Sequence, residues 1–230
     1  MDVVGQNDQQ CSHAGCGLDK WDSPEHRGEV PLRVFLSSPP RYHELMATVV
    51  HPRVEPWEFE ALQENAGWCM DIELIAGEAV LVPPIGGAAS SARGELYAAL
   101  HRWQEDTADG GLVLQDVFVA LPDGSRPAPD ISYWRAERRP PVARGAIQSI
   151  PDLVIEVLSP STRANDLGVK REVYMSSGVR ELWLADPDAH TITRVRPGNI
   201  PDEVLGDGTV LRTELLDGFA LELARVFPAI

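Results

Sequence analysis

Two acidic residues, Asp130 and Glu156, stand in segments whose neighbours predict β-strands. Asp130 lies in RPAPDISYW, where Pro129 favours an extended backbone. Glu156 lies within the apolar run DLVIEVL. An ionised carboxylate buried in such a run is costly unless it has a partner, a metal ion or a proton. The simpler alternative is a strand at a sheet edge, with Glu156 facing solvent.

The segment after Glu156 offers such a partner. Asp166, Lys170 and Tyr174 follow one another at intervals of four residues, so they share one face of a predicted helix. Only Lys170 and Lys20 are lysines among the 20 basic residues. The pKa of a lysine responds to burial, whereas an arginine keeps its charge, so a retained lysine indicates a specific role. The alternative is a solvent-exposed Lys170–Asp166 ion pair, which would stabilise the helix only slightly.

The hydrophobic pattern predicts the elements that position these residues. In chain order we expect a short helix (56–67), two strands (69–84), an amphipathic helix (88–107), a strand (111–121), the strand of Asp130 (128–134), a central buried strand (152–158), a helix capped by Asn165 or Asp166 and ended by Gly178 (165–178), a hairpin (181–196), one or two edge strands and an apolar C-terminal stretch. This order predicts an α/β domain with a mixed sheet and few helices.

The first part of the chain has no sustained periodicity. We expect residues 1–52 to be a mobile or poorly structured segment and residues 53–230 to form the domain. Cys11, His13 and Cys16 are a conceivable metal cluster, but zinc sites need four ligands and no second cluster follows. A further hypothesis is that translation starts near Met46.

Composition limits the class of protein. With 20 Lys+Arg and 35 Asp+Glu, the formal net charge is 20 − 35 = −15. This charge disfavours a protein that coats nucleic acid by bulk electrostatics, but not a nuclease that uses a metal ion. There is no apolar run typical of a signal peptide or membrane span, so we expect a cytoplasmic protein without membrane contact. Motifs of nucleotide-binding loops, zinc proteases and serine hydrolases are missing.

Taken together, the segments resemble a known family. The spacing of Asp130, Glu156 and Lys170 is similar to the PD-(D/E)XK nuclease superfamily, and more closely to the Uma-type restriction endonuclease family of bacterial proteins. The resemblance covers about residues 53–230, and the segments that carry it are IELIAGEAVLVPP, APDISYW, PDLVIEVLSPSTRANDLGVKREVY and GVRELWLADPDAHTI. It implies a restriction-endonuclease-like α/β domain with a mixed sheet flanked by helices.

One position departs from the superfamily pattern. The usual lysine stands two residues after the glutamate, where this chain has Leu158. In the family that the chain resembles, the lysine has moved to the following helix, which matches Lys170. The resemblance thus implies Asp130, Glu156 and Lys170 as catalytic residues, with Asp130 and Glu156 binding Mg²⁺ or Mn²⁺. The implied activity is metal-dependent phosphodiester hydrolysis, with nucleic acid, DNA before RNA, as the partner and a homodimer as one conceivable assembly.

Further residues are candidates for accessory roles. Glu73 matches a glutamate of the family and is a candidate further ligand, while Glu95 is a competing candidate that a solvent-exposed helix face explains better. Tyr174 either positions Lys170 or contacts phosphate, unless it is a core residue. The stretch 124–145 has five basic and two acidic residues, so it is locally 5 − 2 = +3. We expect phosphate contacts there, chiefly from Arg126, Arg135 and Arg138.

Two other functions remain open. A glycosidase-like hydrolase would use the carboxylates of Asp130 and Glu156 as a pair and would leave Lys170 without a role. A non-catalytic interaction or regulatory module on the same fold is the second alternative, and the acidic charge of the chain favours it.

Overall fold

The structure is a computed structural model that describes residues 49–50, 54–57, 59, 71–142 and 144–227. The predicted segment 1–52, with its cysteine–histidine cluster and Met46, lies outside the described residues except for β1 (Val49–Val50). Most of the predicted helix 56–67 also lies outside them. The domain boundary at residue 53 stays a prediction.

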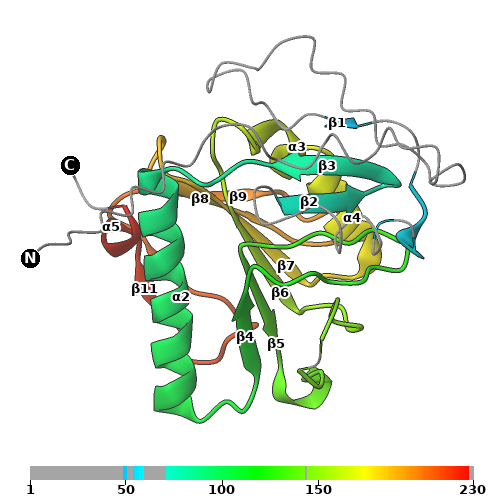
Figure 1. The fold of residues 1–230 in the computed structure, drawn as a ribbon. Helices are drawn as coiled ribbons and strands as arrows, with labels where there is room; N and C mark the ends of the chain where they lie inside the picture. The colour runs from blue at the N-terminus through cyan, green and yellow to red at the C-terminus, as the bar shows by residue number, and fades with distance from the viewer. Residues whose placement is uncertain (1–48, 51–53, 58, 60–70, 143, 228–230) are drawn as a thin grey trace, which may run out of the picture. The chain divides into compact units, whose positions relative to one another are not determined.

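A six-stranded mixed sheet forms the centre of the domain, in the order β4-β5-β6-β7-β8-β9 (Figure 1). Its strands are β4 (Leu112–Gln115), β5 (Ile131–Trp134), β6 (Leu153–Val157), β7 (Glu181–Asp186), β8 (Thr191–Val195) and β9 (Glu203–Leu205). Strands β6 and β7 are parallel, and the other pairs are antiparallel. The predicted α/β class, with a mixed sheet flanked by helices, is confirmed.

Strand β6 is central and buried on both faces, as its apolar run predicts. Leu153, Ile155 and Val157 belong to a cluster with α2 (Gly87–Thr107) and the C-terminal elements. Val154 belongs to the opposite cluster, with α4 (Val169–Ser177). Because side chains alternate along a strand, Glu156 falls on the α4 side.

Two smaller sheets flank this centre. Strands β2 (Asp71–Ile75) and β3 (Glu78–Val82) are the two predicted strands and pair antiparallel, and β1 pairs with β3. Strands β10 (Val210–Leu211) and β11 (Leu221–Glu222) pair near α5 (Leu223–Val226), and a 3₁₀ helix (Ala136–Arg138) follows β5. Among the described helices, none is long and apolar enough to cross a membrane.

The helix predicted over 165–178 forms with an interruption, and the strand predicted over 111–121 is shorter than expected, at Leu112–Gln115. The chain instead forms α3 (Arg163–Leu167) and α4, separated by Gly168, and Thr162 rather than Asn165 or Asp166 precedes the first turn. At Gly168 a Cβ would lie 2.9 Å from the Ala164 carbonyl oxygen, so the break depends on glycine. The predicted end at Gly178 is confirmed, in a left-handed conformation.

Candidate active site

Asp130 and Glu156 meet where β5 begins and β6 ends. Ile131 pairs with Ile155, so the antiparallel register places Asp130 beside Glu156. The Asp130 backbone N–H donates to Glu156 Oε2 at 3.3 Å, and Asp130 Oδ2 accepts the Val157 N–H at 2.7 Å. The two carboxylates are therefore held by backbone contacts of two strands.

Lys170 faces these strands from α4. Its Nζ lies 2.8 Å from Glu156 Oε1, 3.2 Å from Glu73 Oε1 and 3.4 Å from Asp166 Oδ1. The Tyr174 hydroxyl donates to the same Glu156 Oε1 at 2.6 Å. Although α3 and α4 are separate helices, the predicted face of Asp166, Lys170 and Tyr174 forms and turns toward Glu156.

Glu73 joins the group because the segment before Asp130 runs beside β2. The backbone groups of Leu74 and Arg126 bond to each other, and the Ala128 N–H donates to Glu73 Oε1 at 2.8 Å. The same oxygen accepts the contact from Lys170, so Glu73 ties the loop of Asp130 to the lysine.

The site carries more negative than positive charge. Glu73, Asp130, Glu156 and Asp166 face Lys170 and one arginine, so a fully ionised site would have a charge of 2 − 4 = −2. Burial, reinforced by the charge of Glu156, raises the pKa of Asp130 to about 7 and that of Asp166 to about 7. Burial likewise raises the pKa of Glu73 to about 6, against the opposing charge of Lys170.

Lys170 and Tyr174 both remain protonated near neutral pH. Burial alone lowers the pKa of Lys170, but Glu156 and Glu73 outweigh it and hold the pKa well above its ordinary value. Burial and the charge of Glu156 raise the pKa of Tyr174 well above its usual range. Lys170 therefore acts as a fixed positive charge, and Tyr174 as a hydrogen-bond donor.

Arg93, which the sequence does not single out, completes the site from α2. Its Nη1 lies 3.3 Å from Asp130 Oδ1 and 2.7 Å from Asp116 Oδ1. Arg93 follows the buried Ala89 by four residues and precedes the buried Leu96 by three. A charged residue on the apolar face of an amphipathic helix is the sequence signal that could have identified it.

The chain matches a known protein family and a solved structure. A family model, Uma2, described as "Putative restriction endonuclease", matches residues 56–224. The chain belongs to the Uma2 family. A solved structure described as a "putative nuclease belonging to DUF820" from Anabaena variabilis ATCC 29413 matches with a TM-score of 0.65 and 22% identity, covering 76% of this chain and 97% of that chain. At this identity the likeness establishes a shared fold. No curated protein sequence matches.

These findings confirm the resemblance and the restriction-endonuclease-like fold of the Uma2 chain. Through its family, they associate the chain with nucleases, which are hydrolases that act on nucleic acids. The roles of Asp130, Glu156 and Lys170 stay predictions that the observed geometry supports.

The donor set of the Uma2 site fits magnesium better than zinc. Among the described residues, no three or more His, Cys, Asp or Glu side chains are arranged to enclose a metal ion. Mg²⁺ does not need such an enclosure, because one or two carboxylates together with water and phosphate oxygens satisfy it. Asp130 and Glu156 supply two carboxylates in a group with excess negative charge.

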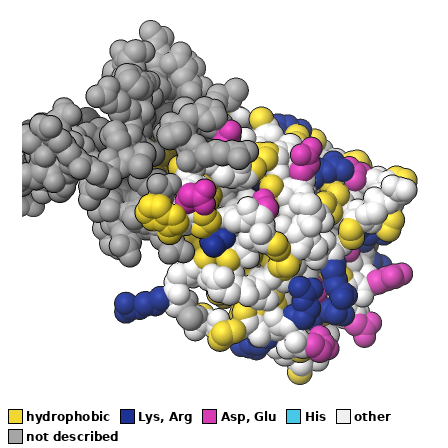
Figure 2. Space-filling view, turned by 90° about the vertical axis from the view of Figure 1, so that its right-hand side faces the viewer, with side chains coloured by type: hydrophobic (Ala, Val, Ile, Leu, Met, Phe, Trp, Pro, Cys, Tyr) yellow, Lys and Arg dark blue, Asp and Glu magenta, His cyan; other side chains and the backbone are white. Residues whose placement is uncertain are grey.

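The arginines predicted as phosphate contacts are not brought to this site. Arg135 and Arg138 follow β5 and therefore lie at its other end, where Asp152 contacts Arg135 Nε at 3.6 Å and Arg138 Nη1 at 2.8 Å. Asp152 precedes Glu156 by four residues of strand, about 13 Å. Arg126 donates to the Gly124 and Ser125 carbonyl oxygens. On the face shown in Figure 2, basic side chains lie in a few groups and are not spread evenly.

Glu95 and a separate pocket lie apart from the predicted chemistry. Glu95 is exposed on α2, and no contact links it to Asp130 or Glu156 among the described residues.

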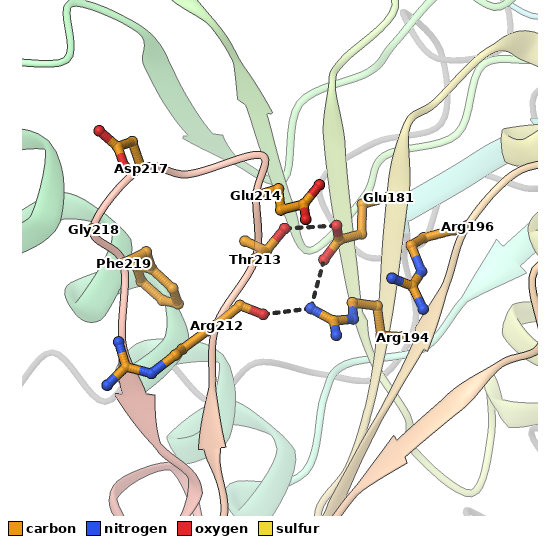
Figure 3. A pocket seen from close by; sticks show the side chains of 9 residues that line it. All are labelled: Glu181, Arg194, Arg196, Arg212, Thr213, Glu214, Asp217, Gly218 and Phe219. Atoms are coloured by element: carbon orange, nitrogen blue, oxygen red, sulfur yellow. Dashed lines mark hydrogen bonds and ion pairs between the residues drawn. The ribbon is translucent and has the colours of Figure 1, made fainter.

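A pocket of about 550 Å³ surrounds Glu181, the first residue of β7, at the opposite end of the sheet (Figure 3). Arg194 contacts Glu181 and the Arg212 carbonyl there, and Thr213 donates to Glu181. These internal contacts mark a structural network.

Proposed function

We propose that this Uma2 chain is a metal-dependent endonuclease that hydrolyses phosphodiester bonds in DNA. The observation that carries the proposal is the convergence of Asp130, Glu156 and Lys170, with Lys170 Nζ 2.8 Å from Glu156. Lys170 is buried beside the carboxylates at the ends of two neighbouring strands. The group therefore offers a negatively charged site for a cation next to a fixed positive charge. The glycosidase-like alternative gives this lysine no role.

Asp130 and Glu156 are the residues that would hold Mg²⁺. When bound, the ion offsets negative charge on a phosphate oxygen and lowers the pKa of a coordinated water. Asp130 Oδ2 is occupied by the Val157 N–H, which leaves Oδ1 as the oxygen without a backbone donor. Glu156 is oriented by the Asp130 N–H and by Tyr174. Both carboxylates are thus held in place before a ligand arrives.

In this scheme Lys170 contributes a positive charge and does not abstract a proton. Because it keeps its proton, it cannot act as the general base, but it can stabilise the negative charge that develops on the phosphate and orient the attacking water. Glu73 and Asp166 fix the ammonium group from two further sides. Tyr174, which bonds to Glu156, acts in this scheme through the carboxylate.

The experiment is a substrate panel with purified protein. Supercoiled plasmid, linear duplex DNA, single-stranded DNA and RNA are incubated with Mg²⁺, with Mn²⁺ and with a chelator. We expect cleavage of DNA with either metal and none with the chelator. Cleavage that the chelator leaves unchanged, or cleavage of RNA alone, would contradict the proposal. A protein inert toward all four substrates would favour the non-catalytic module.

A further inference from the structure

The residues of the site differ in their exposure to solvent. The side chains of Glu156, Asp166, Glu73 and Lys170 are 3–7% exposed. Those of Asp130 and Arg93 are 17% and 22% exposed. Asp130 and Arg93 are thus the most exposed of these six residues, which makes them the ones that a phosphate group from solvent can reach most easily.

Arg93 contacts the very oxygen that the proposed cation needs. Asp130 Oδ2 is taken by the Val157 N–H at 2.7 Å, while Oδ1 faces Arg93 Nη1 at 3.3 Å. The contact of Arg93 with Asp116 is shorter, at 2.7 Å. Arg93 is thus anchored mainly by Asp116 and lies within reach of Asp130, so a cation at Oδ1 would displace the longer contact and leave the shorter one.

Toward the described residues, Arg93 forms hydrogen bonds through one nitrogen only. Both of its contacts are made by Nη1, and among the described residues neither Nε nor Nη2 has a hydrogen-bond partner. A guanidinium presents five N–H donors in a planar fork that matches two phosphate oxygens. The free edge of Arg93 therefore suits a phosphodiester that enters beside Asp130.

We propose that Arg93 is the substrate-binding residue at the mouth of the site: it contacts Asp130 Oδ1 in the metal-free protein and moves to the phosphate when a divalent cation takes that oxygen. This inference rests on the proposed nuclease function. It gives Arg93 two separable effects, competition with the metal in the absence of DNA and attraction of the phosphate in its presence.

The first test measures metal affinity without DNA. Mn²⁺ is titrated into wild type, Arg93→Gln, Arg93→Lys and Asp130→Asn, and free Mn²⁺ is followed by electron paramagnetic resonance. Arg163→Gln is the matched control, because Arg163 also pairs with a strand-end aspartate, Asp186, at 2.7 Å. We expect Arg93→Gln to bind Mn²⁺ about fivefold more tightly than wild type. Arg93→Lys and Arg163→Gln should stay within about twofold.

The second test measures KM for a DNA duplex with the same variants. We expect Arg93→Gln to raise KM about tenfold or more although it binds metal better. Arg93→Lys should also raise KM, because an ammonium lacks the two-pronged geometry. Unchanged or weaker Mn²⁺ binding by Arg93→Gln, or an unchanged KM, would overturn the inference about Arg93 alone. Mn²⁺ binding in wild type that Asp130→Asn leaves intact would overturn the proposed function as well.

Discussion

Lys170 is buried among Glu73, Glu156 and Asp166, and this setting decides what a substitution would do. Loss of the ammonium leaves three buried carboxylates without their common partner, which costs far more than the loss of a surface ion pair. The same change removes the positive charge assigned to the transition state. Stability and activity should therefore fall together at this position, but with different pH dependence.

We predict that Lys170→Met lowers the cleavage rate by about 10²–10³-fold. At pH 8 it should also lower the free energy of unfolding by about 3–5 kcal/mol, and by less at pH 6, where Glu73 and Asp166 take up protons. Urea unfolding at both pH values measures this. Arg171→Met is the matched control, since Arg171 pairs with Asp202 at the surface and should change stability by under about 1 kcal/mol. Equal losses for both variants would contradict the assignment.

The raised pKa of Asp130 determines how metal binding should depend on pH. Its pKa of about 7 means that a proton competes with the cation below that pH. Mn²⁺ affinity should therefore fall about tenfold for each pH unit below 7 and level off above pH 8. Cleavage at subsaturating metal should follow the same curve. A metal affinity that stays constant from pH 5 to 8 would show that Asp130 is not a ligand.

At the scale of elements, the break between α3 and α4 is what aims Lys170 at Glu156. A Cβ at position 168 would lie 2.9 Å from the Ala164 carbonyl oxygen, so Gly168→Ala must shift one of the two helices. We expect a loss of about 1–3 kcal/mol of stability and, because Lys170 moves, a fall in activity of up to about 10²-fold.

The control for this prediction is Gly94→Ala. Gly94 is exposed within α2, and a Cβ there meets no atom within 4 Å. Alanine should stabilise the helix by about 0.5–1 kcal/mol. Thermal melting and a cleavage assay of both variants make the comparison. If Gly168→Ala matched Gly94→Ala in stability and cleaved normally, the helix break would have no role in placing the lysine.

The strands and the site differ in how far the sequence predicts them. The apolar run around Glu156 and the alternation around Glu73 are local patterns, and both strands form as expected. The break at Gly168 does not follow from the hydrophobic pattern, because Asp166, Lys170 and Tyr174 keep their helical spacing across it. Arg135 and Arg138 were placed near Asp130 because they are close in sequence, but the four residues of β5 carry them to the other end of the sheet. Arg93 approaches from α2, through tertiary packing that spacing alone does not show.

At the scale of the whole molecule, the acidic site acts on stability as well as chemistry. In the folded state the pKa values of Asp130 and Asp166 are about 7, above the ordinary value of 3.8. Between pH 4 and 7 the folded chain therefore binds more protons than the unfolded chain, and stability falls as the pH rises through this window. The excess negative charge of the site thus works against the fold near neutral pH when no cation is bound.

We predict that the metal-free protein loses on the order of 5 kcal/mol of unfolding free energy between pH 5 and 8, in similar shares from Asp130 and Asp166. Mg²⁺ should restore stability at pH 8 and have little effect at pH 5, where Asp130 and Asp166 are protonated. Asp130→Asn should flatten the pH dependence and abolish part of the Mg²⁺ effect. Denaturant titrations with and without Mg²⁺ measure all three quantities. A rise in stability from pH 5 to 8 without metal would contradict the burial of these carboxylates.

The most direct measurement of the central claim is plasmid nicking by the wild type and three site variants in Mg²⁺, at equal concentration and with folding checked by thermal melting. The variants are Asp130→Asn, Glu156→Gln and Lys170→Met, and Glu95→Gln serves as the control because Glu95 is exposed on α2. We predict nicking by the wild type and the control, and a loss of at least about 10²-fold in each of the three variants. Nicking that survives all three changes would contradict the account.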